Sequence, residues 1–166
     1  MIWDTKEVVA ADVFEGMSDV FIRCFFESKN AKETDTHFRC GDGKASFNYR
    51  LLFDYKAPND NYNFSVQVWD RDFFCSNDLI GEINLDLQPI FTDVIDTNGS
   101  FSINKQYYNS FLKKVWGDKF PIKFEDEDSF WLPVTGKDFK SDDAKSGELK
   151  INGYVRMSLT IMPIDQ

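Results

Sequence analysis

The segment VWDRDFFCSNDLIGE, residues 68–82, places three aspartates around a short loop that carries two phenylalanines at its tip. Residues two apart in an extended backbone project to the same side, so Asp70 and Asp72 converge, while Asp78 returns from the far side of the loop. Three unpaired carboxylates at that spacing repel one another unless a cation lies among them. Oxygen ligands on a flexible loop suit Ca²⁺, which takes about six to eight of them. The alternative is a solvated acidic loop that caps two strands.

The chain around this segment consists of short β-patterned runs separated by turn-forming residues. In the run Asn63–Asp70, apolar residues at positions 64, 66 and 68 alternate with the residues between them, which predicts a strand. Further runs predict strands in the same way: Val20–Glu27, Phe47–Tyr55, Ile80–Leu87, Phe130–Val134 and Tyr154–Met162. Many short strands of this kind are typical of an all-β fold, an antiparallel β-sandwich.

A long stretch, residues 89–129, interrupts this series of strands. Within it, Lys105–Trp116 has apolar residues at helical spacing, which predicts a short helix packed on the sandwich. Its Lys113 and Lys114 either form a solvated face or face a partner. Because 166 residues suit one domain with a substantial core, we expect a single domain over 1–166, with 89–129 as a loop and helix insertion.

Composition excludes several classes of function. The net charge of −9 disfavours nucleic-acid binding and unaided attraction to an anionic membrane, although a bound divalent cation reverses that charge locally. Cys24, Cys40 and Cys75 are odd in number and lack metal-type spacing, which indicates free thiols in a reducing compartment. No segment approaches 18 apolar residues, and we do not expect the N-terminal residues to be a signal peptide. His37 beside Asp35 predicts a structural hydrogen bond, and no catalytic motif indicates an enzyme.

Three motifs resemble those of C2 domains, eight-stranded antiparallel β-sandwiches that often bind Ca²⁺ at one end. MSDVFIRCFF, residues 17–26, is similar to the family's strand entry, with Val20 in place of a proline. WDRDFFCSNDLIGE, residues 69–82, resembles the third calcium loop and the strand that follows it. GYVRMSLTI, residues 153–161, resembles the last strand.

Four further motifs, in order, resemble the membrane-proximal C2 domain of ferlins: IWDTKEVV, TDTHFR, FNYRLLFDY and FWLP. Ferlins are large, tail-anchored proteins of membrane fusion and repair with several C2 domains. The resemblance implies a truncated first strand, because only two residues precede Trp3. We therefore expect either a fragment of a longer protein or a short relative, without the segment that ferlins insert after FNYRLLFDY.

The resemblance also implies five Ca²⁺ ligands, two from a first calcium loop at residues 11–19 and three from the third loop: Asp12, Asp19, Asp70, Asp72 and Asp78. The spacing between Asp12 and Asp19 is one residue longer than is usual in the family, so Glu15 is an alternative to Asp12. Cys75 occupies a position where many calcium-binding relatives have serine. Because a thiol is a poor ligand for a hard cation, it argues against a third, outermost ion.

Apolar residues lie at the crests of both loops and are the expected membrane-binding groups. They are Val13 and Phe14 in the first loop and Phe73 and Phe74 in the third. Phe74 falls where calcium-binding relatives carry a membrane-inserting residue. The alternative is that one of the two third-loop phenylalanines folds under the loop as packing, and we expect this of Phe73.

Two functions of different classes follow from these observations. The first is a Ca²⁺-dependent module at the cytosolic face of membranes, which binds an anionic phospholipid surface through its loop tips. The second is a calcium-independent C2 scaffold that packs against neighbouring domains or protein partners. Exposed loop tips favour the membrane, and buried tips favour the scaffold.

Overall fold

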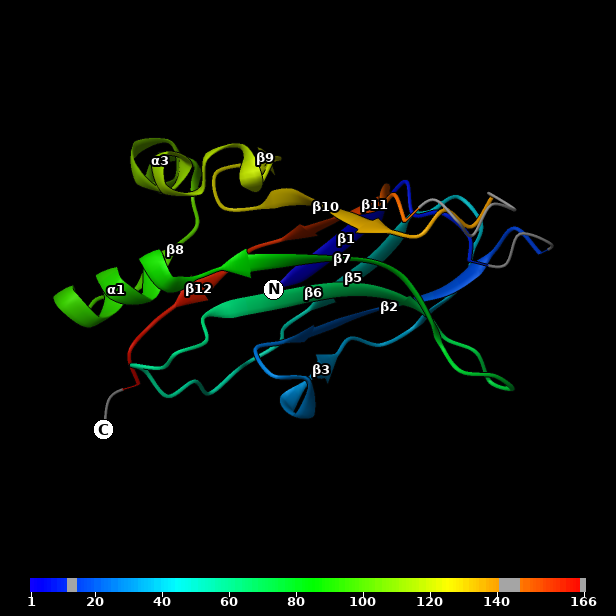
Figure 1. Cartoon of the computed structure of the whole chain (residues 1–166), viewed down its shortest axis with the longest axis horizontal. Helices are drawn as coiled ribbons and strands as arrows, with labels where there is room; N and C mark the ends of the chain where they lie inside the picture. The colour runs from blue at the N-terminus through cyan, green and yellow to red at the C-terminus, as the bar shows by residue number, and fades with distance from the viewer. Residues whose placement is uncertain (12–14, 141–146, 165–166) are drawn as a thin grey trace.

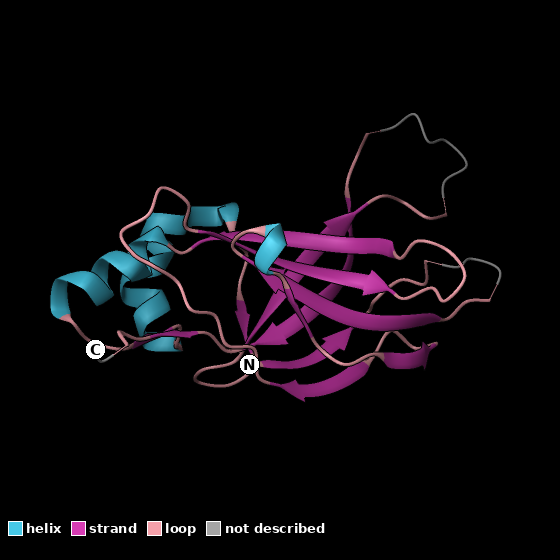
Figure 2. Ribbon diagram, turned by 90° about the horizontal axis from the view of Figure 1, so that it is seen from below, coloured by secondary structure: helices cyan, strands magenta, loops and turns pink. Residues whose placement is uncertain are grey.

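The computed structural model describes residues 1–11, 15–140 and 147–164. Figure 1 shows a curled antiparallel sheet that forms two facing layers, and Figure 2 shows most of the helices gathered at one end of it. The strands are β1 (Ile2–Lys6), β2 (Ser18–Phe25), β3 (Lys32–Glu33), β4 (His37–Cys40), β5 (Ala45–Tyr49), β6 (Asn63–Asp70), β7 (Asp78–Asp86), β8 (Phe101–Ser102), β9 (Lys123–Phe124), β10 (Phe130–Gly136), β11 (Lys150–Met157) and β12 (Thr160–Ile161).

The main sheet has the order β3-β2-β6-β7-β10-β11-β1-β5, with β4 paired to β2 and β9 to β10, while β8 and β12 form a separate two-stranded ladder. The layers meet where Glu82 of β7 pairs with Thr135 of β10. Glycine is required at this junction, because a Cβ added to Gly136 would lie 2.1 Å from the carbonyl oxygen of Ile80. All described strand pairs are antiparallel, and the expected β-sandwich is confirmed.

The core lies between the two layers and is lined by the inward face of each strand. Val66 and Val68 of β6 are fully buried, as are Leu132 and Val134 of β10 and Val155 of β11. Each such side chain contributes about 1.5–3 kcal/mol when it is withdrawn from water. Apolar residues therefore alternate along the strands because one face of each strand lies against the opposite layer.

The expected strand Phe47–Tyr55 is only half right, because β5 ends at Tyr49. The segment that follows keeps its alternating pattern but forms no strand. Its Phe53 and Tyr55 pack on Phe26, with ring centroids 6.2 and 4.2 Å from that ring. An alternating pattern shows that one side of an extended segment is buried, and here aromatic packing supplies that burial without a ladder.

The expected helix over Lys105–Trp116 is confirmed, although it consists of α2 (Lys105–Tyr107), a π-helical turn (Tyr108–Leu112) and α3 (Lys113–Trp116). A second helix, α1 (Gln88–Thr97), was not predicted. A proline stands in its first turn, and Asn98, which adopts the left-handed conformation, ends it. Both are common features of helix ends. Helix α1 buries Ile90, Phe91 and Val94. Two single turns, Ser28–Asn30 and Gly117–Lys119, are 3₁₀-helical.

Candidate functional site

The loops that follow β1, β4, β6 and β10 leave the sheet at the end opposite α1 and α3, as Figure 1 shows. The antiparallel register causes this arrangement, because Asp70 at the end of β6 pairs with Val20 of β2 and with Asp78 of β7. In the same way, Ser18 at the start of β2 pairs with Cys40 at the end of β4. The first and third predicted calcium loops therefore belong to the same end of the molecule.

Asp70 is the most buried carboxylate of this end, with 6% of its surface exposed. The backbone N–H of Asp19 donates a hydrogen bond to its Oδ1 at 2.6 Å. Burial raises the pKa of Asp70, hydrogen bonds from Asp19 and Ser18 lower it, and the nearby charges of Asp72 and Asp19 raise it. An anion is thus held at the strand end with other anions close to it.

Asp19 connects three elements at this end. Its Oδ1 accepts a hydrogen bond from the backbone N–H of Arg39 on β4 at 2.8 Å, and its carbonyl oxygen accepts one from the N–H of Arg71 at 2.8 Å. The Arg71 side chain points elsewhere, since its guanidinium donates to Thr36 and contacts Glu33 at 3.1 Å. The Arg71 cation is therefore paired with Glu33 and not with the loop-end aspartates.

Asp72 and Asp78 complete the described part of the predicted ligand set. Asp72 is exposed, and its backbone N–H donates to Oδ1 of Asn77 at 3.0 Å, which closes the loop. Asp78 is half-buried at the first position of β7. The remaining predicted ligand, Asp12, lies outside the described residues, as do the predicted membrane contacts Val13 and Phe14.

The donor chemistry of this end suits Ca²⁺, since carboxylate oxygens are the ligands that a hard cation prefers. Within residues 1–11, 15–140 and 147–164, however, no three His, Cys, Asp or Glu side chains lie close enough together to hold a metal ion. The described aspartates therefore make a concentrated negative charge without, by themselves, closing a coordination shell. Cys75 in the same loop is exposed, and all three cysteines are free thiols, as expected.

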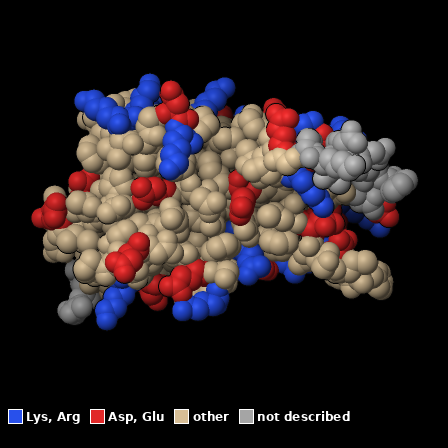
Figure 3. Space-filling view, viewed as in Figure 1, with Lys and Arg blue, Asp and Glu red and all other residues tan. Residues whose placement is uncertain are grey.

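The tip of the β6–β7 loop is apolar and projects into solvent. Phe74 is 100% exposed and Phe73 is 70% exposed, so the expectation that Phe73 folds under the loop is wrong. Below this tip, the Asp72–Asn77 hydrogen bond closes the loop, and Asp70 pairs with Asp78 where the two strands end. Figure 3 shows this loop at the lower right with no charged side chain at its tip and acidic side chains where it joins the body.

Phe38 of β4 is a residue of this end that the sequence reasoning missed. It is 57% exposed, and its ring stacks on Phe73 with a centroid distance of 6.2 Å and an interplanar angle of 9°. Arg39 has a positive φ of 56°, an uncommon conformation for a side-chain-bearing residue. This backbone conformation interrupts the alternation of inward and outward side chains along β4, and the Phe38 side chain is exposed to solvent. The strand pattern alone does not predict this result.

The C2 domain family model matches residues 1–103. The chain belongs to the C2 domain family. Its similar curated proteins include Ferlin 1 of Toxoplasma gondii, 33% identical over 55% of this chain, and mouse and human myoferlin, 31% and 27% identical over 52% and 53% of it. The matches cover 6% of the length of each of these proteins.

The same fold is found in a solved structure. A C2 domain of plant Extended Synaptotagmin 1 superposes with a TM-score of 0.55 at 12% identity, over 99% of this chain and 92% of that chain. Because the identity is low, this likeness concerns the C2 fold alone. Among the described helices of this C2 domain, none has the length and apolar character needed to cross a membrane.

Proposed function

We propose that this C2 domain docks onto anionic phospholipid membranes through its loop end, in a Ca²⁺-dependent manner. The observation that carries the proposal is the fully exposed Phe74, which projects beside Phe73 and Phe38 from a base of buried and half-buried aspartates. Exposed clusters of large apolar side chains are unfavourable in water and mark interaction sites. Here the phenylalanine cluster lies beside aspartates whose negative charge repels an anionic membrane.

The two features are complementary in the presence of Ca²⁺. Without the ion, Asp70, Asp72 and Asp78 repel an anionic lipid surface and hold the loop tip away from it. Ca²⁺ would supply positive charge that offsets the carboxylates and a Lewis-acidic contact for lipid phosphate. Insertion of one phenylalanine side chain into the acyl boundary then contributes about 1.5–3 kcal/mol. The loop end thus acts as an electrostatic switch.

The proposal also covers the extent of the domain, its cellular location and the protein to which it belongs. Residues 1–166 form one domain with 89–129 as an insertion, which works at the cytosolic face of membranes as a binding module rather than an enzyme. The similarity to ferlins supports a place in a larger, ferlin-like protein of membrane fusion or trafficking. In this proposal Asp12 and Asp19 complete the ligand set, and Val13 and Phe14 join the apolar tip.

Vesicle co-sedimentation tests the switch. Vesicles that contain phosphatidylserine should sediment the protein in millimolar Ca²⁺ and not in EDTA, and Asp70→Asn with Asp72→Asn should abolish the Ca²⁺-dependent fraction. The matched control is Asp60→Asn with Asp96→Asn, since both residues are exposed and lie outside the loop end. Sedimentation that is independent of Ca²⁺ and of the Asp70 and Asp72 substitutions would contradict the proposal.

The scaffold function is the second candidate. It is favoured by half-exposed apolar side chains on the insertion, namely Ile95, Phe111 and Val115, which are 50%, 37% and 52% exposed. Crosslinking in cell extract, with Phe111→Ser and Val115→Ser as the variant, tests it. A stable protein neighbour lost in the variant would support the scaffold, and the absence of any such neighbour would remove it.

A further inference from the structure

A groove of about 680 Å³ runs along the outside of the seam between β7 and β10, and none of the loop-end aspartates lines it. Its floor and walls come from Leu79 and Ile83 of β7, Pro133 of β10 and Ile151 of β11, and Phe120 and Pro121 close one side. Pro133 has no N–H to donate to a ladder, and the register between β7 and β10 is described only at Glu82 and Thr135. The groove therefore lies beside the β7–β10 junction, where the two layers of the sandwich meet. Its volume lies within the usual range for small-molecule sites.

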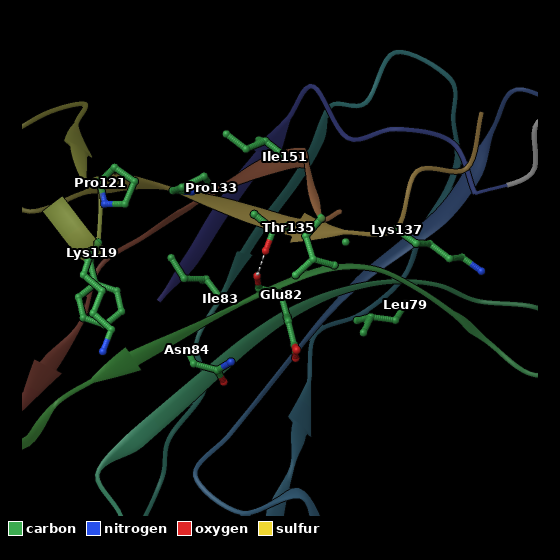
Figure 4. A pocket seen from close by; sticks show the side chains of 13 residues that line it. Leu79, Glu82, Ile83, Asn84, Lys119, Pro121, Pro133, Thr135, Lys137 and Ile151 are labelled. Carbon is green, nitrogen blue, oxygen red and sulfur yellow. Dashed lines mark hydrogen bonds between the residues drawn. The ribbon is translucent and has the colours of Figure 1, made fainter. Parts of the chain in front are cut away.

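Three polar residues that line this groove, Glu82, Asn84 and Thr135, have hydrogen-bond partners within the protein. Glu82 accepts a hydrogen bond from Gln67 at 2.9 Å, and its carbonyl oxygen accepts one from Thr135, which Figure 4 shows as a dashed line. Asn84 accepts a hydrogen bond from the Ser65 hydroxyl. A peptide in the groove would find few side-chain groups to satisfy its own polar backbone. An apolar occupant has no polar backbone that needs such partners.

The two ends of the groove are cationic. Figure 4 shows Lys119 at one end and Lys137 at the other. Their ammonium groups lie over aromatic rings, 5.6 Å from the Phe120 centroid and 4.8 Å from the Phe139 centroid. Among the ion pairs of residues 1–11, 15–140 and 147–164, none includes either lysine. These two lysines place positive charge at both ends of the groove.

The rim of the groove carries aliphatic side chains that the fold itself leaves uncovered. Leu149 is 66% exposed and Ile151 is 55% exposed, although both line the groove. An occupant that lies along the groove would cover them. An apolar body with a negative charge at one end matches this combination of aliphatic walls, satisfied polar groups and terminal lysines.

We propose that this groove binds one long-chain fatty acid, with the acyl chain along the β7–β10 seam and the carboxylate paired with Lys119 or Lys137. The site would be independent of Ca²⁺, because none of its lining residues belongs to the loop-end aspartates. It would give this C2 domain a second, lipid-derived ligand besides a membrane surface.

A dansyl-labelled undecanoic acid, titrated into the purified chain in EDTA, tests the site. Saturable enhancement of fluorescence is expected, with displacement by oleate. Ile151→Asp should weaken binding by about tenfold or more, because it places a charge against the acyl chain. Leu52→Asp is the matched control, since Leu52 is 70% exposed and lies outside the groove.

Charge recognition is tested separately. Lys119→Gln with Lys137→Gln should weaken the labelled acid several-fold and leave its methyl ester unchanged, whereas Lys113→Gln with Lys114→Gln should change neither. Circular dichroism checks the fold of each variant, and Leu149→Asp replaces Ile151→Asp if that variant is unfolded. Absence of saturable binding, or equal binding by the groove variants and controls, would overturn the proposal. Displacement of the probe by an acidic apolar peptide but not by oleate would also overturn it.

All these titrations are made without Ca²⁺, so their outcome is separable from that of the vesicle experiment. Methyl resonances of Leu79 and Ile83, which line the groove, supply a readout that does not depend on the probe's fluorescence. They should shift with oleate, and the methyl resonances of Leu52 should not.

Discussion

Asp70 is a strand residue and a candidate ligand at once. Its carboxylate accepts the Asp19 N–H at 2.6 Å and thereby ties the end of β6 to the start of β2. Burial is the largest cause of its raised pKa. The folded state therefore binds a proton at Asp70 more readily than the unfolded chain does, and stability is lost as the pH rises through its pKa.

Asp70→Asn should accordingly stabilise the domain at neutral pH in EDTA. Asparagine retains an oxygen that accepts the Asp19 N–H and removes the charge that burial and Asp72 disfavour. We expect a rise in the melting temperature of roughly 1–3 °C at pH 7, which diminishes toward pH 4 as the wild-type carboxyl becomes protonated. Calorimetric scans over this pH range measure the difference. A variant less stable than the wild type at pH 7 would show that the carboxylate itself is needed.

Phe74, in contrast to the buried Asp70, is fully exposed and has no packing role in the folded domain. Because it is 100% exposed, Phe74→Ala should leave the melting temperature unchanged. The same substitution should weaken Ca²⁺-dependent vesicle binding by about tenfold or more, since it removes most of the inserted apolar surface. Leu52→Ala, at a residue that is 70% exposed, serves as the control. Equal vesicle binding by the two variants would contradict insertion of Phe74.

At the scale of elements, the helical insertion is attached to the sheet by its buried face. Trp116 of α3 is 4% exposed, and its indole N–H donates to the carbonyl oxygen of Asp86 at the end of β7, at 2.9 Å. Helical periodicity predicts which face is buried, but it does not identify the strand that the face contacts. The insertion therefore has a defined attachment that only the folded chain reveals.

Trp116→Phe should reduce the free energy of unfolding by about 1–3 kcal/mol. The ring remains apolar, but the Asp86 carbonyl loses its donor in a partly buried position. Urea unfolding measures the change. Val115→Ala, at a neighbour that is 52% exposed, should alter stability by less than about 0.5 kcal/mol. A similar effect of both substitutions would mean that α3 is not anchored through this bond.

For the molecule as a whole, one core connects the sandwich and the insertion. Ile103, Leu112, Trp116 and Phe120 of the insertion belong to the same buried cluster as Val66 of β6. A shared core predicts a shared unfolding transition. We therefore expect the insertion to unfold with the sandwich rather than before it.

Equilibrium unfolding followed by tryptophan fluorescence and by far-ultraviolet circular dichroism should give coincident transitions. Trp116 reports on the insertion and Trp3, Trp69 and Trp131 report on the strands, while the circular dichroism follows the backbone of the whole domain. Two separated transitions would show that the insertion and the sandwich unfold as distinct units, which would contradict the single-domain prediction.

Features that depend on near neighbours along the chain were predictable from the amino-acid sequence. The alternation in Asn63–Asp70 predicted β6 with the bounds that the structure has, and helical spacing located Lys105–Trp116. Short spacing also placed Asp70 and Asp78 at facing strand ends, because a hairpin fixes the register of its two strands. The C2 fold and the position of its loop end follow from these local patterns together with the family motifs.

Contacts between distant residues became known only from the folded chain. The Phe38–Phe73 stack, the Asp19–Asp70 hydrogen bond and the β7–β10 groove each join segments that are far apart in sequence. The early end of β5 also depends on a distant contact, because Phe53 packs against the ring of Phe26 and does not pair with a neighbouring strand. Periodicity describes which side of a segment is buried, whereas the identity of what covers it depends on how the whole chain is folded.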